Sequence, residues 1–166
     1  GAFAAIGQNN IKRLLAYSSI ENIGLIVVGL GLAMVFAAYK MSSLAALALV
    51  ASLYHCINHA LFKSLLFLGT GSVLHATQER NLGKLGGLIR RMPQTAVFFL
   101  IGAMSISGIP LLNGFVSEWL TFQTALQAPA LESGVLRSII PVAAAVLALS
   151  AALAAACFVK VYGVAF

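Results

Sequence analysis

The sequence predicts an all-α fold, a polytopic bundle of transmembrane helices. Hydrophobic residues make up 61% of the 166 residues and charged residues only 8%, whereas about 25% of the residues of a soluble domain are charged. The mean hydropathy is +1.00. Apolar runs long enough to cross a hydrocarbon core of about 30 Å alternate with short polar segments. These three observations exclude an ordinary soluble domain.

The charge balance fits a membrane protein rather than a nucleic-acid-binding protein. Ten Lys and Arg against four acidic residues give a net charge of +6, but the basic residues lie mostly between the apolar runs, as the positive-inside rule describes. No nucleic acid is expected as a partner. Cys56 and Cys157 both lie within apolar segments, which favours buried thiols over a disulfide framework or a metal or redox pair.

We expect about four full spans and a partial one in a single transmembrane domain over residues 1–166. The expected helices comprise residues 11–38, 43–73, 93–107 continuing as 115–127, and 139–162. The second is longer than a straight crossing needs, so we expect tilt, a kink or an end that emerges from the membrane, with Gly69 and Gly71 marking where the helix can loosen. The last is rich in Ala and carries Pro141 in its first turn.

The third span is expected to be discontinuous. Its apolar run up to Ser107 is only about 14 residues long, and residues 107–114 then contain two glycines and a proline, which interrupt a helix. Irregular backbone at membrane depth is tolerated only where its polar groups line a cavity or are buried in protein. Glu118, in the first turn after the break, is therefore a candidate functional residue.

The loop over residues 75–91 predicts the orientation. It contains Arg80, Lys84, Arg90 and Arg91 against a single acid, Glu79. An excess of basic residues in a short loop indicates the cytoplasmic side. The alternation of spans then places Lys12 and Arg13 on the same side and Lys40 on the opposite one.

Three ionisable residues recur every four positions within the second span, namely His55, His59 and Lys63. On a helix each is displaced by about 40° from the last, so they form a polar ladder roughly 12 Å long on one face. Ionisable groups inside a membrane are costly and usually face a bundle interior or a water-filled path. Because histidine titrates near neutral pH, the ladder suggests proton or ion handling.

Two other readings of the ladder stay open. The histidines can be structural, bonding to neighbouring helices while Lys63 snorkels to the interface. Alternatively, His at i and i+4 can share a zinc ion as in HExxH. The intervening Cys56-Ile57-Asn58 offers no Glu base and no third ligand follows, so no metal is expected.

Three further charged residues are candidates for the same path. Glu21 lies deep in its span within a dense polar patch that also contains Tyr17, Ser18, Ser19 and Asn22. Lys12, at the start of that span, fits either a topology determinant or a site residue. Lys160 lies near the end of the last span, where it can snorkel to the cytoplasmic interface.

Three motifs occur in one order: Asn10-Ile-Lys-Arg-Leu-Leu-Ala-Tyr-Ser-Ser-Ile-Glu-Asn-Ile-Gly24, His55-x3-His59-Ala-Leu-Phe-Lys-Ser-Leu-Leu-Phe-Leu-Gly69 and Gly108-Ile-Pro-Leu-Leu-Asn-Gly-Phe-Val-Ser-Glu-Trp119. Together they resemble the proton-conducting, antiporter-like membrane subunits of complex I, Mrp-type cation/proton antiporters and membrane-bound hydrogenases. Within that superfamily, the Ser-Ser-Ile-Glu-Asn form is most similar to the branch in hydrogenase-4 and formate hydrogenlyase. Complex I subunits tend to have Ser-Thr-x-Ser-Gln there.

The resemblance implies roles for individual residues. It implies positions on the family's central hydrophilic axis for Lys12, His55, His59 and Lys63. Glu118 matches the terminal group of the half-channel that leads to the outside. Asn10 departs from the Asp usual before Ile-Lys-Arg, which alters how Lys12 is held. Since Gly1 is not an initiator methionine and Phe166 ends inside an apolar run, we expect a fragment of the later half, without the other half-channel.

The resemblance also implies a function. We expect a non-redox subunit of a membrane-bound oxidoreductase or translocase complex in the inner membrane, passing protons along the ladder to Glu118. The expected partners are other membrane and hydrophilic subunits, the bilayer and protons. No ligand set for iron–sulfur, nickel–iron or flavin centres is visible in this chain, so such cofactors are expected in partner subunits. The alternatives are a secondary cation/proton antiporter subunit and a structural membrane anchor.

Overall fold

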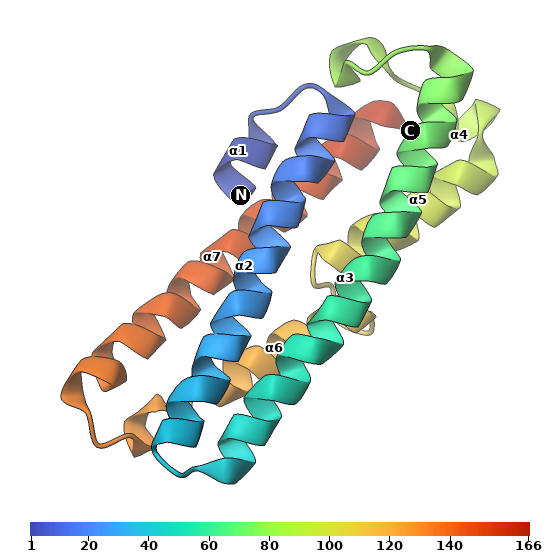
Figure 1. Ribbon diagram of the computed structural model, residues 1–166. Coiled ribbons are helices and arrows are strands. Elements are labelled where there is room, and N and C mark those ends of the chain that lie inside the picture. Colours follow the sequence, from blue (N-terminus) through green and yellow to red (C-terminus); the bar gives the residue numbers. More distant parts are fainter.

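The computed structural model describes residues 1–166, and its elements are all helical, with one isolated bridge between Asn10 and Asn81. The predicted all-α membrane bundle is confirmed (Figure 1). The elements are α1 (Ala2–Ile6), α2 (Ile11–Ala38), α3 (Ser42–Thr77), the 3-10 helix η1 (Leu82–Lys84), α4 (Leu88–Arg91), α5 (Pro93–Ile106), α6 (Asn113–Ala125), the 3-10 helix η2 (Ala128–Ala130) and α7 (Gly134–Ala165).

Three helices are long and apolar enough to cross a membrane: α2 with 28 residues, α3 with 36 and α7 with 32. The expected third span is divided between α5, with 14 residues, and α6, with 13. Each is too short to cross a core of about 30 Å alone, because a helix rises about 1.5 Å per residue. The predicted discontinuity is confirmed, since α5 ends at Ile106 and α6 begins at Asn113. In Figure 1, α2 and α3 run antiparallel side by side, joined by a tight turn.

The expectation that α3 loosens at Gly69 and Gly71 is wrong. The helix continues through both glycines and ends only at Thr77, four residues beyond the expected position. A Cβ atom at Gly69 would lie 3.0 Å from Cδ2 of Phe99 in α5. That glycine therefore serves close packing between α3 and α5 rather than flexibility.

The last helix begins earlier than expected. The Ser133 side-chain oxygen accepts from the Leu136 backbone N–H and caps the helix, so α7 begins at Gly134 instead of residue 139. Pro141 consequently lies inside the helix and not in its first turn. The missing N–H of Pro141 leaves one carbonyl of the preceding turn without its helical partner.

Close contact between α2 and α3 positions the polar residues of both helices. A Cβ atom at Gly29 would lie 3.0 Å from Cβ of Ser52, so a small residue is needed there. The Ser52 hydroxyl donates to the backbone oxygen of Ile26 at 2.8 Å. The short distance between the two helices lets side chains of α3 reach groups on α2.

A polar layer separates two apolar clusters along the bundle. The cluster nearer the loop over residues 78–92 includes Leu14, Phe62 and Phe99. The cluster at the opposite end includes Phe36 and Ile140. Between them along α2 and α3 lie the buried polar residues Ser18, Asn22, Ser52, His55 and Asn58.

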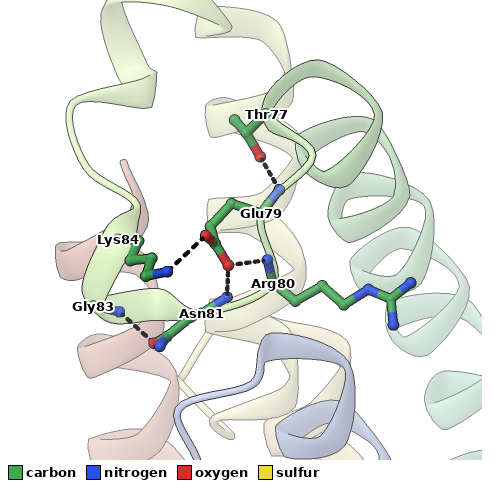
Figure 2. Close-up of polar contacts among 6 residues, drawn as sticks. All are labelled: Thr77, Glu79, Arg80, Asn81, Gly83 and Lys84. Carbon is green, nitrogen blue, oxygen red and sulfur yellow. Dashed lines mark hydrogen bonds and ion pairs between the residues drawn. The ribbon is translucent and has the colours of Figure 1, made fainter.

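Two loops meet at one end of the bundle. The Ile11 backbone N–H donates to the Arg80 oxygen at 3.1 Å and the Leu82 N–H to the Asn9 oxygen at 2.8 Å. The start of α2, with Lys12, is therefore at the same end as the loop after α3. In Figure 2, Glu79 accepts hydrogen bonds from two backbone N–H groups of its own loop.

Candidate functional site

The candidate site lies where α2, α3 and α6 meet, and His55 is at its centre. The His55 side chain is fully buried. Its Nδ1 lies 2.9 Å from the Ser117 hydroxyl of α6, and its Nε2 lies 3.1 Å from Oδ1 of Asn22 in α2. One imidazole therefore joins three helices.

Asn22 determines which nitrogen of His55 carries the hydrogen. The amide nitrogen of Asn22 donates to the Ser18 backbone oxygen at 2.8 Å. Since a carbonyl only accepts, the amide must face Ser18 with its NH₂ group and His55 with its oxygen. The Asn22 oxygen in turn only accepts, so Nε2 of His55 bears hydrogen and Nδ1 of the neutral ring accepts from Ser117.

The Ser117 hydroxyl has one hydrogen to donate, and more than one acceptor atom lies within its reach. Besides Nδ1 of His55, the backbone oxygen of Gly114 lies 3.0 Å away. Asn58 donates to the Ser117 oxygen at 3.2 Å. When His55 gains a proton, Nδ1 becomes a donor to Ser117 and the serine hydrogen can turn to Gly114. Both protonation states of His55 are thus hydrogen-bonded.

An amide pair fixes α6 to α3 beside this histidine. The Asn113 side-chain nitrogen donates to Oδ1 of Asn58 at 3.1 Å, and the Asn58 nitrogen donates to the Asn113 backbone oxygen at 2.9 Å. Asn113 is the first residue of α6. The first turn after the helix break is therefore held in register with the polar layer.

Lys63 binds to α2 two turns along α3 from His55. Its Nζ is buried and donates to the Ser18 hydroxyl at 2.6 Å and to the Leu15 backbone oxygen. The Ser18 hydroxyl also lies 3.0 Å from the Leu15 oxygen. Like Ser117, Ser18 can direct its hydrogen to either of two acceptors, depending on whether Lys63 carries a proton. Ser18 thus contacts both Lys63 and Asn22.

His59, between the other two ladder residues, has no hydrogen-bond partner. Its Nε2 is buried and unpaired, and its ring packs edge-on against Phe62 with centroids 5.6 Å apart. The groups of α2 that bond to His55 and Lys63 form no hydrogen bond with His59. The structure therefore joins two of the three ladder residues to α2.

Glu21 and Glu118 line one small cavity, which also includes Asn22 and Ser150. Its volume is about 20 Å³, enough for about one water molecule. Glu21 accepts from the Ser150 hydroxyl of α7 at 2.8 Å through one oxygen, while its other oxygen is buried without a partner. The cavity brings together carboxylates from two helices that the sequence places far apart.

Gly108 makes room for Glu118. It has a φ of 62°, a conformation that favours glycine, and a Cβ atom there would lie 2.6 Å from Oε2 of Glu118. The break in the third span thus shapes the space that holds this carboxylate. Because α6 begins at Asn113 and not at residue 115, Glu118 lies in the second turn rather than the first.

We call the polar residues of the candidate site the cluster; its members are Ser18, Glu21, Asn22, His55, Asn58, His59, Lys63, Asn113, Ser117, Glu118 and Ser150. Two predicted candidates lie outside this cluster. Lys12 is exposed at the start of α2. The Lys160 ammonium donates to the backbone oxygen of Ile6 at 3.0 Å, where it joins α7 to α1.

Sequence reasoning missed the roles of Asn58, Asn113 and Ser150 as partners of the candidate residues. A signal for Ser150 exists, because it is the only hydroxyl residue between residues 139 and 156 of an Ala-rich helix. Asn58 follows His55 by three positions, and this spacing places both on neighbouring parts of one helix face.

Comparison with known proteins identifies the family. The sequence profile of the family described as "NADH:quinone oxidoreductase/Mrp antiporter, TM" matches residues 1–140. The chain belongs to this family. The match includes the whole of α2, α3, α5 and α6, and hence every residue of the cluster except Ser150.

Relatives in this antiporter-like family include two Escherichia coli K12 proteins that align with the entire chain. It is 43% identical to hydrogenase-4 component B and 45% identical to formate hydrogenlyase subunit 3, covering 25% and 27% of their lengths. The structure is also similar to a chain of the Mrp complex from Dietzia sp. DQ12-45-1b, with a TM-score of 0.75 and 28% identity over 97% of this chain and 26% of that one. The chain thus spans about a quarter of the length of these three proteins.

Proposed function

We propose that this chain is part of a proton-translocating, antiporter-like subunit of a membrane-bound redox complex, and that its buried His, Lys and Glu residues relay protons. The observation that carries the proposal is the environment of His55. A fully buried imidazole has both nitrogens hydrogen-bonded, and its neighbours can accommodate either protonation state. A histidine that only holds helices together needs hydrogen-bond partners for one protonation state, not for both.

In this mechanism the proton on His55 is gained and lost at Nδ1. In the neutral ring, Nε2–H donates to Asn22 and Nδ1 accepts from Ser117. Protonation makes Nδ1 a donor, and the Ser117 hydrogen turns to the Gly114 oxygen. The imidazolium then lies between two oxygen acceptors, which stabilise its charge. Deprotonation reverses both changes.

On one side of His55, the path continues to His59 and Lys63. Lys63 can release a proton because the Ser18 hydrogen can leave the Leu15 oxygen and donate to the neutral amine. The buried, unpaired Nε2 of His59 lies on the same helix between them. In the proposal, a water molecule at this nitrogen links His59 to Lys63, since a buried polar atom without a protein partner commonly binds water.

On the other side, Glu118 is the proposed outlet. It follows Ser117 directly in α6 and shares a water-sized cavity with Glu21. One water there can exchange a proton between two carboxylates without side-chain rearrangement. Lys12 and Lys160, which lie outside the cluster, are assigned to the cytoplasmic end of the path.

The assembly is also inferred. The E. coli relatives are named as a component and a subunit, which supports a place among other membrane and hydrophilic subunits. Iron–sulfur, nickel–iron or flavin centres would belong to those partners. We place the complex in the inner membrane with the loop over residues 78–92 on the cytoplasmic side, because its basic residues follow the positive-inside rule.

Replacing Glu118 with Gln in the full-length complex tests the proposal. We expect proton uptake into inverted vesicles, measured by dye quenching, to fall at least about tenfold, because an amide cannot exchange the proton. The complex should still assemble. Redox turnover, measured in parallel, falls with the uptake. Glu132→Gln, in an exposed position of the loop before α7, is the matched control. Unchanged uptake in Glu118→Gln would show that Glu118 is structural and the outlet is wrong.

A second function, secondary cation/proton antiport, is favoured by two observations. Two carboxylates line the cavity, and the structure resembles a chain of an Mrp complex. Sodium-driven proton movement without any redox substrate would identify this function. Proton uptake only during redox turnover would identify the first.

A further inference from the structure

A polar pocket lies outside the cluster, at the end of the bundle where the loop before α2 meets the loop after α3. Its volume is about 400 Å³ and all its lining residues are polar. We call it the loop pocket; it is lined by Gln8, Asn9, Asn10, Arg13, Glu79, Arg80 and Asn81.

The walls of the loop pocket are held by backbone hydrogen bonds. Two of these bonds, which form the Asn10–Asn81 bridge, join the two loops. Asn10 also accepts from the N–H groups of Lys12 and Arg13 at 3.1 and 3.3 Å, and Asn81 accepts from Gly83 at 3.0 Å. The pocket is thus built before any ligand arrives.

The one acid of the pocket is already engaged. In Figure 2, Glu79 accepts from the backbone N–H groups of Arg80 and Asn81, both at 2.9 Å, and lies 3.7 Å from the Lys84 ammonium. The backbone N–H groups of Asn81 and Arg80 lower the pKa of the Glu79 carboxyl below its usual value. Glu79 is therefore ionised at neutral pH, and its charge is offset by Lys84.

Two guanidinium groups remain free in the pocket. Arg13, from α2, and Arg80, from the opposite loop, are both exposed and form no ion pair. In Figure 2 the Arg80 side chain extends away from Glu79. Guanidinium groups bind phosphate oxygens through two parallel hydrogen bonds. The pocket thus presents two unpaired positive charges from separate walls.

The position of the pocket relative to the bilayer indicates which phosphate groups it can bind. Helix α2 has 28 residues and is about 42 Å long, whereas the hydrocarbon core is about 30 Å thick. Its ends, including the first turn with Arg13, therefore extend into the headgroup layer. Basic pockets at this level bind anionic lipid headgroups.

We propose that the loop pocket binds the headgroup phosphate of an anionic phospholipid between Arg13 and Arg80. The side-chain amides of Gln8 and Asn9 supply further donors and acceptors for the headgroup hydroxyls. The bound lipid joins the start of α2 to the end of α3, the two helices that carry the ladder and its partners.

The test uses the full-length protein in neutral detergent, titrated with phosphatidylglycerol and observed by native mass spectrometry. In the double variant R13Q/R80Q, we expect phosphatidylglycerol to bind at least about tenfold more weakly, because two charge-assisted hydrogen-bonding groups are lost. The double variant R90Q/R91Q removes the same charge from α4, outside the pocket, and should bind within about twofold of the unmodified protein. Phosphatidylcholine should bind neither variant nor the unmodified protein tightly.

Several outcomes would overturn the proposal. Equal weakening in both double variants would show a diffuse charge effect, and no weakening in either would show that the arginines do not bind lipid. Complete displacement of phosphatidylglycerol by millimolar inorganic phosphate would assign the pocket to a free anion. Loss of a partner subunit from R13Q/R80Q with lipid binding unchanged would assign it to an acidic protein segment.

Discussion

Replacing His55 with Gln is expected to reduce redox-driven proton uptake by the full-length complex about 100-fold or more. Glutamine fits the space and can still hydrogen-bond to Asn22 and Ser117, the two partners of the imidazole. It cannot take up a proton at neutral pH, so the relay stops at the centre of the polar layer. Dye quenching in inverted vesicles measures the uptake, and the amount of assembled complex is followed in the same membranes.

The matched control is His75→Gln, the same change at an exposed position near the end of α3. It should leave uptake within about twofold of the unmodified complex, because surface substitutions rarely disturb the folded state. His55→Gln pumping at the unmodified rate, in a fully assembled complex, would mean that this histidine only connects helices.

Replacing Gly114 with Ala is expected to destabilise the protein, although Gly→Ala within a helix ordinarily stabilises it by about 1 kcal/mol. Gly114 is buried in the first turn of α6, and a Cβ atom there would overlap the Ser105 backbone oxygen at the end of α5. Neither backbone can move without disturbing the helix break, so we expect a loss of about 3 kcal/mol. Thermal denaturation of the purified complex measures the effect.

The control for this change is Gly24→Ala in α2, where a Cβ atom would meet nothing within 4 Å. That variant should denature at the temperature of the unmodified protein or slightly above it. If both variants denature alike, α5 and α6 do not approach as closely as described, and the shape of the Glu118 cavity is wrong.

The helices and their break follow from local sequence. Asn10, which caps α2, and the two glycines and proline of residues 107–114 act on their own backbone, so residues 11–38 and the interruption could be predicted without tertiary information. The ends of the other helices, such as the end of α3 and the start of α7, were less predictable. The hydropathy pattern did not show that Ser133 caps α7, nor that packing against Phe99 makes Gly69 a part of the helix.

The candidate site was predictable residue by residue but not as an arrangement. The four-residue spacing showed that His55 and Lys63 share a face of α3, yet it could not show that both meet α2 while His59 meets Phe62. Those contacts depend on how each helix is rotated in the bundle. The cavity shared by Glu21 and Glu118 joins residues almost one hundred positions apart, and local patterns carry no signal for it.

The measurement that tests the relay most directly is proton uptake per redox turnover in Ser117→Ala and Ser117→Thr. Alanine removes the hydroxyl that bonds to Nδ1 of His55 without removing an ionisable group, while threonine keeps it. The relay predicts at least about a tenfold loss with alanine, substantial recovery with threonine and normal assembly of both. Equal uptake per turnover in the alanine variant and the unmodified complex would contradict it, because protons would then cross this layer without Ser117.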